Sequence, residues 1–215
     1  DKTDYIIAAL RKNSVPYITF STHDQNADFF GENISFEITN CLATSFDLRG
    51  FGKIHLNVPG EFSVSNALAA AAVSMNSGAN FEDVAKSLAL VHVFGRAEPV
   101  KHEKCDFAVI IDYAHNALSL ESLFCSVKHY KPKHIITVFG CGGNRSKLRR
   151  YDMGEISGQY SDLSVITSDN PRTEKLDDII DDILTGIKKT NGKYVIIKSR
   201  KDAICHALSV ARKGD

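Results

Sequence analysis

The sequence predicts an α/β protein whose second part contains a mostly parallel, doubly wound sheet. After Arg96, short apolar runs alternate strictly with helical stretches, and this alternation is typical of parallel sheets. Each run is apolar almost throughout, which favours strands buried on both faces. A chain of 215 residues is long enough for two cores. We therefore expect two domains, at 1–97 and 98–215, joined near Gly95–Pro99.

The first part mixes alternating and helical patterns. Its opening segment, Tyr5–Leu10, indicates the end of a helix. An Ala-rich stretch, Val64–Met75, predicts a long helix, and Gly78 suits the left-handed residue beyond its end. A second amphipathic helix is expected at Phe81–Leu90, with Asn80 as its N-terminal cap. Alternation of apolar and polar residues predicts strands at Val15–Phe20, Ile34–Ile38, Cys41–Leu48 and Lys53–Val58.

The second part predicts a series of strand–helix pairs. The strands are expected at Phe107–Ile111, His134–Phe139, Leu163–Thr167 and Tyr194–Lys198. The helices are expected at Ser119–Tyr130, Leu148–Tyr160, Leu176–Lys188 and Lys201–Ala211. In such sheets, ligands bind beyond the carboxyl ends of the strands. This rule predicts one binding face made by the loops Asp112–Asn116, Gly140–Arg145 and Ser168–Arg172.

The composition narrows the classes of function. Twenty-six basic residues balance twenty-six acidic ones, so the overall charge favours neither nucleic acid nor an anionic membrane as a partner. The cysteines are scattered and form no paired motif, which indicates neither a zinc site nor a disulfide framework; they are Cys41, Cys105, Cys125, Cys141 and Cys205. Because no signal peptide or long apolar span is present, we expect a reduced, cytoplasmic protein.

The first candidate cluster is Asp112–Asn116, which directly follows a predicted buried strand. The carboxylate of Asp112 can accept both hydroxyls of a ribose, and His115 can donate to a phosphate. The alternative is a helix cap, because Asp and Asn are preferred in such loops. The spacing alone supports the two interpretations equally.

The second cluster is the glycine-rich and basic segment Gly140–Arg150. Its glycines let the backbone approach a ligand, and the following helix N-terminus offers free N–H groups. The donor fork of Arg145 suits capture of a carboxylate, and Lys147, Arg149 and Arg150 add positive charge. The alternative is a tight turn before a solvated helix start. Cations there oppose the helix dipole by about 0.3–1 kcal/mol each, so we expect an anion to offset that cost.

The third cluster again lies at a predicted strand end. Asp169, Asn170 and Arg172 offer an acceptor, an amide and a cation, which together suit the ammonium and carboxylate of an amino acid. Pro171 fixes the loop that carries them. The alternative is an Asx-type turn that opens a helix.

Three isolated residues complete the candidates. Asn66 lies within the Ala-rich helix, where Asn is mildly unfavourable, and it could contact an adenine edge or simply face solvent. Arg96 lies at the domain junction, where it could reach a nucleotide or form an ion pair with Glu98. Cys141 has no paired base beside it, so we interpret it as a packing residue.

Together these segments resemble the Mur ligase family, and within it the ligases that add diaminopimelate. They occur in the family's order and cover nearly the whole chain. Pro59–Asn66 resembles the pattern G-x-F-N-x-x-N, and Gly95–Glu98 resembles G-R-x-E. Asp112–His115 is similar to D-Y-A-H. Cys141–Met153 resembles C-G-G-D-R-D-x-x-K-R-x-x-M, and Asp169–Arg172 is similar to the D-N-P-R associated with diaminopimelate recognition.

The resemblance implies a segment of a central ATPase domain followed by a Rossmann-like C-terminal domain. It implies that ATP is contacted by Asn66, Arg96, Asp112 and His115. It implies that the incoming amino acid is bound by Arg145, Asp169, Asn170, Pro171 and Arg172. The implied reaction, with Mg²⁺ as cofactor, transfers the γ-phosphoryl of ATP to a carboxylate of UDP-N-acetylmuramoyl-L-alanyl-D-glutamate. The amino group of meso-diaminopimelate then attacks the acyl phosphate.

The chain also departs from the family pattern. Asn144 and Ser146 stand where the family has Asp, Arg149 stands for Lys, and Ser63 stands for Asn. No G-x-x-x-x-G-K-[ST] loop is present to hold a triphosphate, and the segment with magnesium ligands is missing. We therefore expect a fragment that is inactive alone.

Two alternatives remain open at this point. One is another Mur ligase, or a ligase like folylpolyglutamate synthase, that uses a different amino acid. The other is a non-catalytic nucleotide-binding module, which the missing triphosphate loop favours. An NAD(P) oxidoreductase is disfavoured, because the glycine spacing does not fit a dinucleotide fingerprint.

Overall fold

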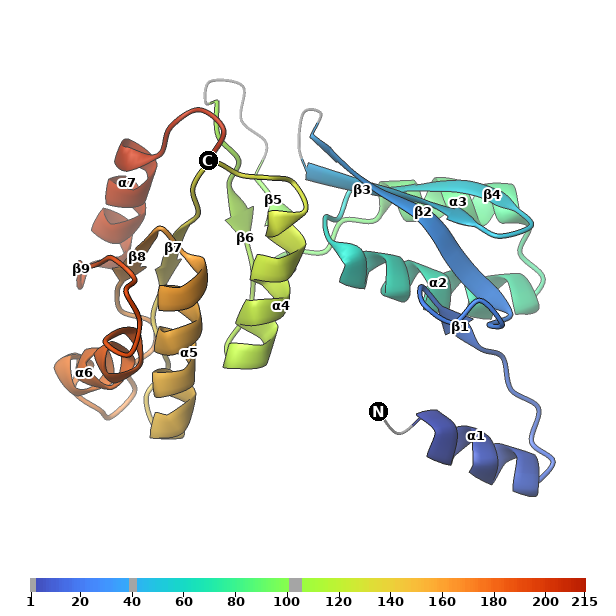
Figure 1. Cartoon of the computed structure of the whole chain (residues 1–215), viewed down its shortest axis with the longest axis horizontal. Helices are drawn as coiled ribbons and strands as arrows, with labels where there is room; N and C mark the ends of the chain where they lie inside the picture. Colours follow the sequence, from blue (N-terminus) through green and yellow to red (C-terminus); the bar gives the residue numbers. More distant parts are fainter. Residues whose placement is uncertain (1–2, 39–41, 101–105) are drawn as a thin grey trace. The chain divides into compact units, whose positions relative to one another are not determined.

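The computed structural model describes residues 3–38, 42–100 and 106–215, which form two compact units (Figure 1). The first unit comprises Asp1–Glu37, Ala43–Asn57 and Glu61–His92, and the second comprises Ile38–Leu42, Val58–Gly60 and Val93–Asp215. Cys41 and Cys105 lie outside the described residues. The domain boundary expected between residues 97 and 98 stays a prediction.

The first unit contains a four-stranded sheet in the order β1-β2-β3-β4, and three helices. Its strands are β1 (Phe20–Ser21), β2 (Phe29–Ile38), β3 (Leu42–Leu48) and β4 (Gly52–Leu56). Its helices are α1 (Thr3–Lys12), α2 (Glu61–Asn76) and α3 (Phe81–Leu90). The pairing of β1 with β2 is parallel, and that of β3 with β4 is antiparallel. The helix expected at Phe81–Leu90 is confirmed, and Asn80 caps it by accepting a hydrogen bond from the Asp83 amide at 2.9 Å.

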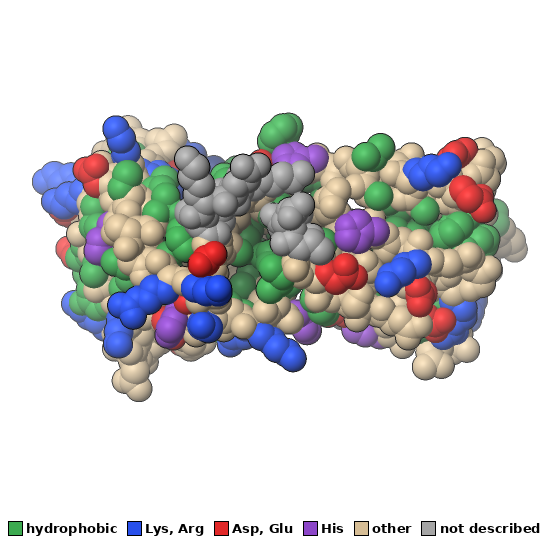
Figure 2. Space-filling view, turned by 90° about the horizontal axis from the view of Figure 1, so that it is seen from above, with side chains coloured by type: hydrophobic (Ala, Val, Ile, Leu, Met, Phe, Trp, Pro, Cys, Tyr) green, Lys and Arg blue, Asp and Glu red, His purple; other side chains and the backbone are tan. Residues whose placement is uncertain are grey.

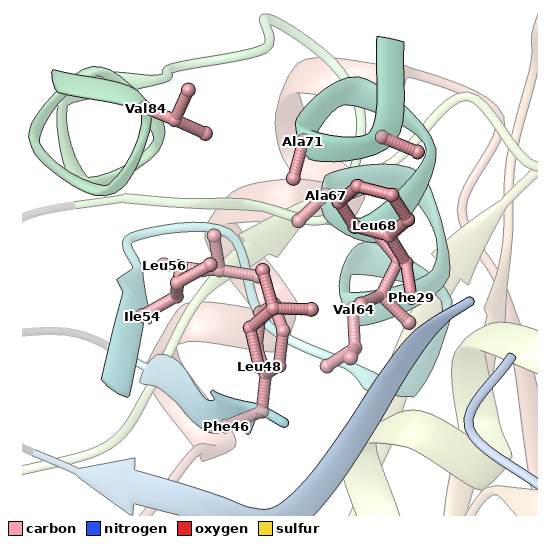
Figure 3. Packing of buried hydrophobic residues seen from close by; sticks show 11 residues of the cluster. Phe29, Phe46, Leu48, Ile54, Leu56, Val64, Ala67, Leu68, Ala71 and Val84 are labelled. Atoms are coloured by element: carbon pink, nitrogen blue, oxygen red, sulfur yellow. The ribbon is translucent and has the colours of Figure 1, made fainter. Parts of the chain in front are cut away.

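An apolar core lies between the sheet and α2 (Figure 3). Phe46 of β3 and Ile54 of β4 are fully buried, as are Val64 and Leu68 of α2. A Cβ atom on Gly31 of β2 would lie 3.1 Å from the Leu68 side chain, so the strand and the helix pack closely. Burial of apolar side chains on one face of the sheet thus fixes α2, the helix that carries Asn66.

The strand expected at Val15–Phe20 is wrong for all but its last residue. Val15 and Ile18 are each 45% exposed, so the apolar alternation has no core to face. The Thr19 amide donates to the Asp28 carboxylate at 2.8 Å instead of to a neighbouring strand. Alternation without burial therefore produced an irregular segment here.

The second unit contains a three-stranded parallel sheet in the order β7-β8-β9, with helices on both faces. The strands are β7 (Ile136–Phe139), β8 (Leu163–Ile166) and β9 (Tyr194–Ile196). The helices are α4 (Ala117–Lys128), α5 (Lys147–Tyr160), α6 (Leu176–Ile187) and α7 (Arg200–Val210). Phe139 and Ile166 belong to the core shared with α4, α5 and α6, whereas Val165 packs with Ala203 of α7. The predicted α/β class and parallel sheet are confirmed.

The first strand expected in this unit differs from its prediction. Only Ile110–Ile111 of the expected Phe107–Ile111 forms a strand, β6. It pairs antiparallel with β5 (Glu98–Pro99), in a separate two-stranded sheet. The expectation of burial on both faces is also wrong here, because Ile111 is 50% exposed, and Ile196 of β9 is 44% exposed. An apolar run indicates an extended segment but carries no information about which neighbour it pairs with.

Helices α5 and α6 approach so closely that glycine is required at their contact. A Cβ atom on Gly154 would lie 2.1 Å from the Ile183 carbonyl oxygen, and one on Gly186 would lie 1.8 Å from that of Tyr151. Both distances are far inside van der Waals contact, so any side chain there would push the helices apart.

Charged side chains are distributed over both units. On the face shown in Figure 2, Lys and Arg side chains lie among Asp and Glu rather than in one continuous field. Among the described residues, no helix is long and apolar enough to span a membrane.

Candidate functional site: two loops joined at the strand ends

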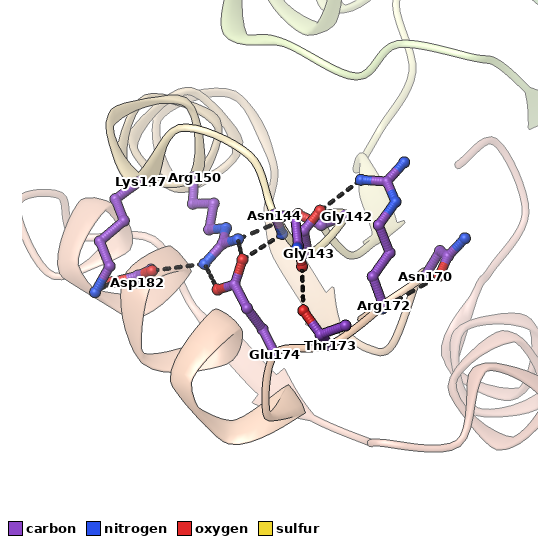
Figure 4. A network of polar contacts seen from close by, with 10 residues as sticks. All are labelled: Gly142, Gly143, Asn144, Lys147, Arg150, Asn170, Arg172, Thr173, Glu174 and Asp182. Atoms are coloured by element: carbon purple, nitrogen blue, oxygen red, sulfur yellow. Dashed lines mark hydrogen bonds and ion pairs between the residues drawn. The ribbon is translucent and has the colours of Figure 1, made fainter.

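Two of the three predicted loops join each other at the carboxyl ends of neighbouring strands. The glycine loop, residues 140–146, follows β7, and the proline loop, residues 167–175, follows β8. The Gly143 amide donates to the Asn170 carbonyl oxygen at 2.8 Å, and the Arg172 guanidinium donates back to the Gly143 carbonyl oxygen (Figure 4). Thr173 Oγ1 donates to Asn144 Oδ1 at 3.0 Å. The two loops are therefore held together by both backbone and side-chain bonds.

Glycine is required where the loops meet. A Cβ atom on Gly143 would lie 1.8 Å from the Pro171 carbonyl oxygen, so no side chain fits there. This places Pro171, one of the predicted site residues, directly against the glycine loop.

Two non-glycine residues in these loops have left-handed backbones. Asn144 has a φ of 54° and Arg172 has a φ of 51°. Asn tolerates this region, whereas a long side chain such as Arg is strained there, and such strain is concentrated at functional sites. The Arg172 amide donates to Asn170 Oδ1 at 3.2 Å, so the Asx-type turn named as the alternative does form.

A buried arginine ties the base of both loops to the helices behind them. Arg150, the fourth residue of α5, has a side chain only 1% exposed. Its Nη1 and Nη2 each donate to the Glu174 carboxylate at 2.8 Å, and Nη1 also donates to Asp182 of α6 at 2.9 Å. Nη2 reaches the Gly142 carbonyl oxygen at 3.3 Å. Glu174 in turn accepts a hydrogen bond from the Asn144 amide.

This network corrects one sequence interpretation. The sequence predicts that Arg150 contributes to binding of an anionic ligand, but the structure pairs Arg150 with acidic residues of the same chain. The Arg150 guanidinium and the Asn144 amide lower the pKa of Glu174 from 4.5 to about 2. Lys147 lies 3.8 Å from Asp182 as well. The anion expected at the start of α5 is thus supplied by Glu174 and Asp182.

The remaining predicted amino-acid ligands lie on the exposed side of the joined loops. Arg145, Asp169, Asn170 and Arg172 are all exposed. Among the described residues, Arg145 forms no hydrogen bond or ion pair. The structure brings these residues onto two loops that are bonded to each other.

Cys141 in the glycine loop is a packing residue, as predicted. Its thiol is buried and contacts the Met153 sulfur at 3.7 Å. Burial raises the pKa of the Cys141 thiol to about 12, which keeps it protonated and unreactive at neutral pH.

The third loop, 112–116, is organised separately. The Asp112 carboxylate accepts the Ala97 amide at 2.7 Å and the Ala114 amide at 2.6 Å. The cap of α4 is Asn116, which accepts from the Ser119 amide at 2.9 Å. The helix-cap alternative therefore holds for Asn116 and is wrong for Asp112.

The predicted nucleotide residues lie beside this loop or on α2. Arg96 stacks over the Tyr113 ring, with 5.0 Å from its Cζ to the ring centroid, and the rings of Tyr113 and His115 lie 5.2 Å apart. Asn66 lies on an exposed position of α2 in the first unit. Their contact with ATP stays a prediction.

Sequence reasoning missed Glu174, Asp182 and Tyr113 as parts of these arrangements. Tyr113 lay inside a recognised motif, which is the signal that could have identified it. Glu174 and Asp182 are 24 and 32 residues from Arg150, and no spacing rule links such distant positions. Among the described residues, no group of three or more His, Cys, Asp or Glu could hold a metal ion.

Comparison with known families gives two matches that together cover most of the chain. The model described as "Mur ligase, glutamate ligase domain" matches residues 95–215, and the "Mur ligase middle domain" matches residues 1–74. A UDP-N-acetylmuramoyl-L-alanyl-D-glutamate–2,6-diaminopimelate ligase from Alkaliphilus metalliredigens is 42% identical over 98% of this chain and 42% of its own length. A ligase of the same name from Caldanaerobacter subterraneus is 47% identical over 76% of this chain and 34% of its own length.

Solved structures agree on the fold. A UDP-N-acetylmuramoyl-L-alanyl-D-glutamate–2,6-diaminopimelate ligase aligns with a TM-score of 0.64 and 23% identity, over 100% of this chain and 44% of its own. The folylpolyglutamate synthase of Mycobacterium tuberculosis aligns with a TM-score of 0.72 and 19% identity, over 97% and 46%. The chain thus spans less than half the length of these proteins.

Proposed function

Because the chain belongs to the Mur ligase family, we propose that it forms the amino-acid-binding end of an ATP-dependent ligase of peptidoglycan precursor synthesis. The whole protein would add meso-diaminopimelate to UDP-N-acetylmuramoyl-L-alanyl-D-glutamate in the cytoplasm. The names of the relatives at 42% and 47% identity support this substrate pair. The observation that carries the proposal is the bonded pair of loops that places Arg145 and Arg172 at the same sheet edge.

In the proposed reaction the chain acts by positioning and by charge. The substrate carboxylate attacks the γ-phosphorus of ATP, ADP leaves, and an acyl phosphate forms. The amino nitrogen of diaminopimelate then attacks the acyl carbon, and inorganic phosphate leaves. Arg145 and Arg172 would hold the amino acid's carboxylate, while Asp169 and the Asn170 amide would orient its ammonium groups.

The nucleotide would be held by groups outside the joined loops. The Asp112 carboxylate keeps acceptor capacity for a ribose hydroxyl beside its two backbone bonds, because each oxygen carries two lone pairs. Arg96 and His115 would face the phosphates, and Asn66 would contact the adenine. Mg²⁺ would neutralise phosphate charge when bound, and we assign no magnesium ligand to this chain.

The test measures amide formation by the complete product of the gene that encodes this chain. Purified protein is given ATP, UDP-N-acetylmuramoyl-L-alanyl-D-glutamate and either diaminopimelate, lysine or glutamate. We expect turnover with diaminopimelate and at least tenfold less with lysine. Turnover with glutamate but not with diaminopimelate would reject the proposal in favour of another ligase of this fold. Binding of nucleotide without turnover would favour the non-catalytic module.

A variant of Arg172 tests the assignment of the site. Arg172→Asn removes the charge while keeping a residue that tolerates the left-handed backbone. We expect calorimetric affinity for diaminopimelate to fall at least tenfold. Lys193→Asn, an exposed cation before β9, is the matched control and should leave the affinity unchanged. Equal affinity in Arg172→Asn and the wild type would remove Arg172 from the site.

A further inference from the structure

We propose that Arg150 is a positioning residue that sets the register of the glycine and proline loops, and through them the placement of Arg145 and Arg172. The inference rests on the proposed function for the meaning of that placement. Arg150 itself is buried and cannot touch a substrate. Its contribution must pass through the groups it binds.

The first step of the argument is the closed ring of contacts around Arg150. Its guanidinium holds both oxygens of Glu174, which belongs to the proline loop. Glu174 holds the Asn144 amide, and the guanidinium also reaches the Gly142 carbonyl oxygen, both in the glycine loop. The Arg150 side chain therefore contacts both loops directly, and Glu174 adds a second link between the loops through its bond to the Asn144 amide (Figure 4).

The second step is that the ring is anchored to the helices. Arg150 is part of α5, and Asp182 of α6 binds its Nη1 at 2.9 Å. The two helices are in backbone contact at Gly154 and Gly186, so they offer a rigid base. The loops are thus fixed to a frame, not merely to each other.

The third step concerns why this network contains charges. Burying an ion pair costs desolvation energy, and well-packed apolar residues of similar volume often give equal or greater stability. Among the residues that the structure describes, the buried Nε–H of Arg150 also has no hydrogen-bond partner, which carries a further cost. The planar guanidinium of Arg150 fixes the direction of each hydrogen-bond partner, which neither apolar residues nor lysine can do. The network is therefore best explained by geometry that the joined loops require.

The fourth step is the strain that the network holds in place. Asn144 and Arg172, the two residues with left-handed backbones in these loops, are each bonded to the opposite loop. Strained backbone persists only where surrounding contacts over-determine it. Weakening Arg150 should therefore let the strained backbone of Arg172 relax, and this would displace the Arg172 guanidinium.

The experiment uses Arg150→Lys, which keeps the charge but loses the fork, and Glu174→Gln, which keeps the shape but loses the charge. Glu174 is 30% exposed, so the second variant guards against failure of the first to fold. The control is Lys189→Met, which removes the ion pair between the exposed Lys189, just beyond the end of α6, and Glu155 of α5. All variants are made in the complete gene product.

Hydrogen exchange gives the first measurement, and it does not depend on the proposed function. We expect amides of residues 140–146 and 167–175 to exchange at least tenfold faster in Arg150→Lys and Glu174→Gln. In both variants, exchange should rise less within α5 and α6 than within the two loops, and Lys189→Met should match the wild type throughout. Unchanged exchange in the two loops of a folded variant would overturn the inference.

Kinetics give the second measurement. We expect the KM for the amino acid to rise about tenfold in both variants, with the KM for ATP within twofold of the wild type. A parallel rise in both KM values would indicate general loosening and would overturn the positioning role. If the wild-type protein forms no amide with any amino acid, the proposed function fails, while loop exchange still decides whether Arg150 sets their register.

Discussion

Each of the two units of this chain is stabilised internally, and the kinds of interaction that do so differ between them. The core cluster of the first unit consists of apolar side chains, with Phe46, Ile54 and Leu68 fully buried between sheet and helix. The neutral side chains of Thr44 and Ser45 are buried beside it, and no charged side chain is buried among that unit's described residues. The second unit has an apolar core too, but it also buries a charged side chain, Arg150, at the edge that carries the predicted site. Apolar burial is non-directional, whereas the guanidinium fork fixes the direction of each partner. The buried charge thus lies where the glycine and proline loops need a fixed orientation. Packing of α2 on its sheet requires only apolar contact.

The strongest test of this comparison removes the buried charge. Arg150→Met leaves Glu174 and Asp182 beside an apolar side chain, without their shared partner. We expect the unfolding free energy of the second unit to fall by about 3–5 kcal/mol, because breaking one side of a buried pair leaves unpaired charge. Urea unfolding followed by hydrogen exchange in α5 and α6 measures this. A loss below about 1 kcal/mol would mean that the acids find solvent and that the network is dispensable.

A cavity in the first unit tests the other half of the comparison. Leu68→Ala should lower the unfolding free energy of the first unit by about 2–5 kcal/mol, through lost burial and the space left behind. Val73→Ala on the same helix is the control, because Val73 is 69% exposed. The glycine and proline loops should keep their wild-type exchange rates in Leu68→Ala. Faster exchange in those loops would show that the two units do not stabilise themselves independently.

The start of α4 offers an intermediate case, because its side-chain cap is the single residue Asn116. Asn116→Ala removes the acceptor for the Ser119 amide and should lower the unfolding free energy by about 1 kcal/mol. Asn116→Asp should retain most of the stability, because Asp is an equally good cap. Thermal unfolding of the two variants separates them. Equal loss in both would show that Asn116 acts through something other than its side-chain oxygen.

Acid provides the mildest test of the ion network. The pKa of Glu174 is lowered to about 2 in the folded protein, so its pairing stabilises the fold fully above about pH 4.5. That contribution is lost as the pH falls from about 4.5 through about 2. The stability difference between wild type and Glu174→Gln should be constant near neutrality and shrink below pH 4.5. A difference that persists at pH 2 would assign the effect to shape and not to charge.

Some of this structure could be predicted from the sequence because local signals agreed. Asn80 and the apolar periodicity after it gave α3 its exact bounds, and the continuous apolar runs identified β7, β8 and β9. The strand expected at Val15–Phe20 failed because alternation alone does not show whether a core lies beside it. Local pattern therefore predicts an element best where caps and burial point the same way.

The meeting of two loops at one sheet edge could be predicted from the sequence, but the residues that support those loops could not, and the ligand contacts of the loops stay a prediction. The strand-end rule placed the glycine and proline loops at one sheet edge, and the structure joins them. Nothing in the sequence indicated that Arg150 turns inward while Arg145 stays exposed, because both lie in the same basic run. Side-chain direction at a helix start depends on acids that come 24 and 32 residues later. The spacing of residues along the sequence does not reveal ion pairs between such distant positions.

The hydrogen bond between Thr173 and Asn144 has a consequence for chimeras made between members of this family. A chimera that carries only the proline loop of a relative would place a different residue opposite Asn144. It would then lose the hydrogen bond that Thr173 donates to Asn144. Grafting residues 140–182 as one cassette would carry Asn144, Arg150, Glu174 and Asp182 together. Recombination within this family should therefore yield working hybrids chiefly when the crossover points fall outside that stretch.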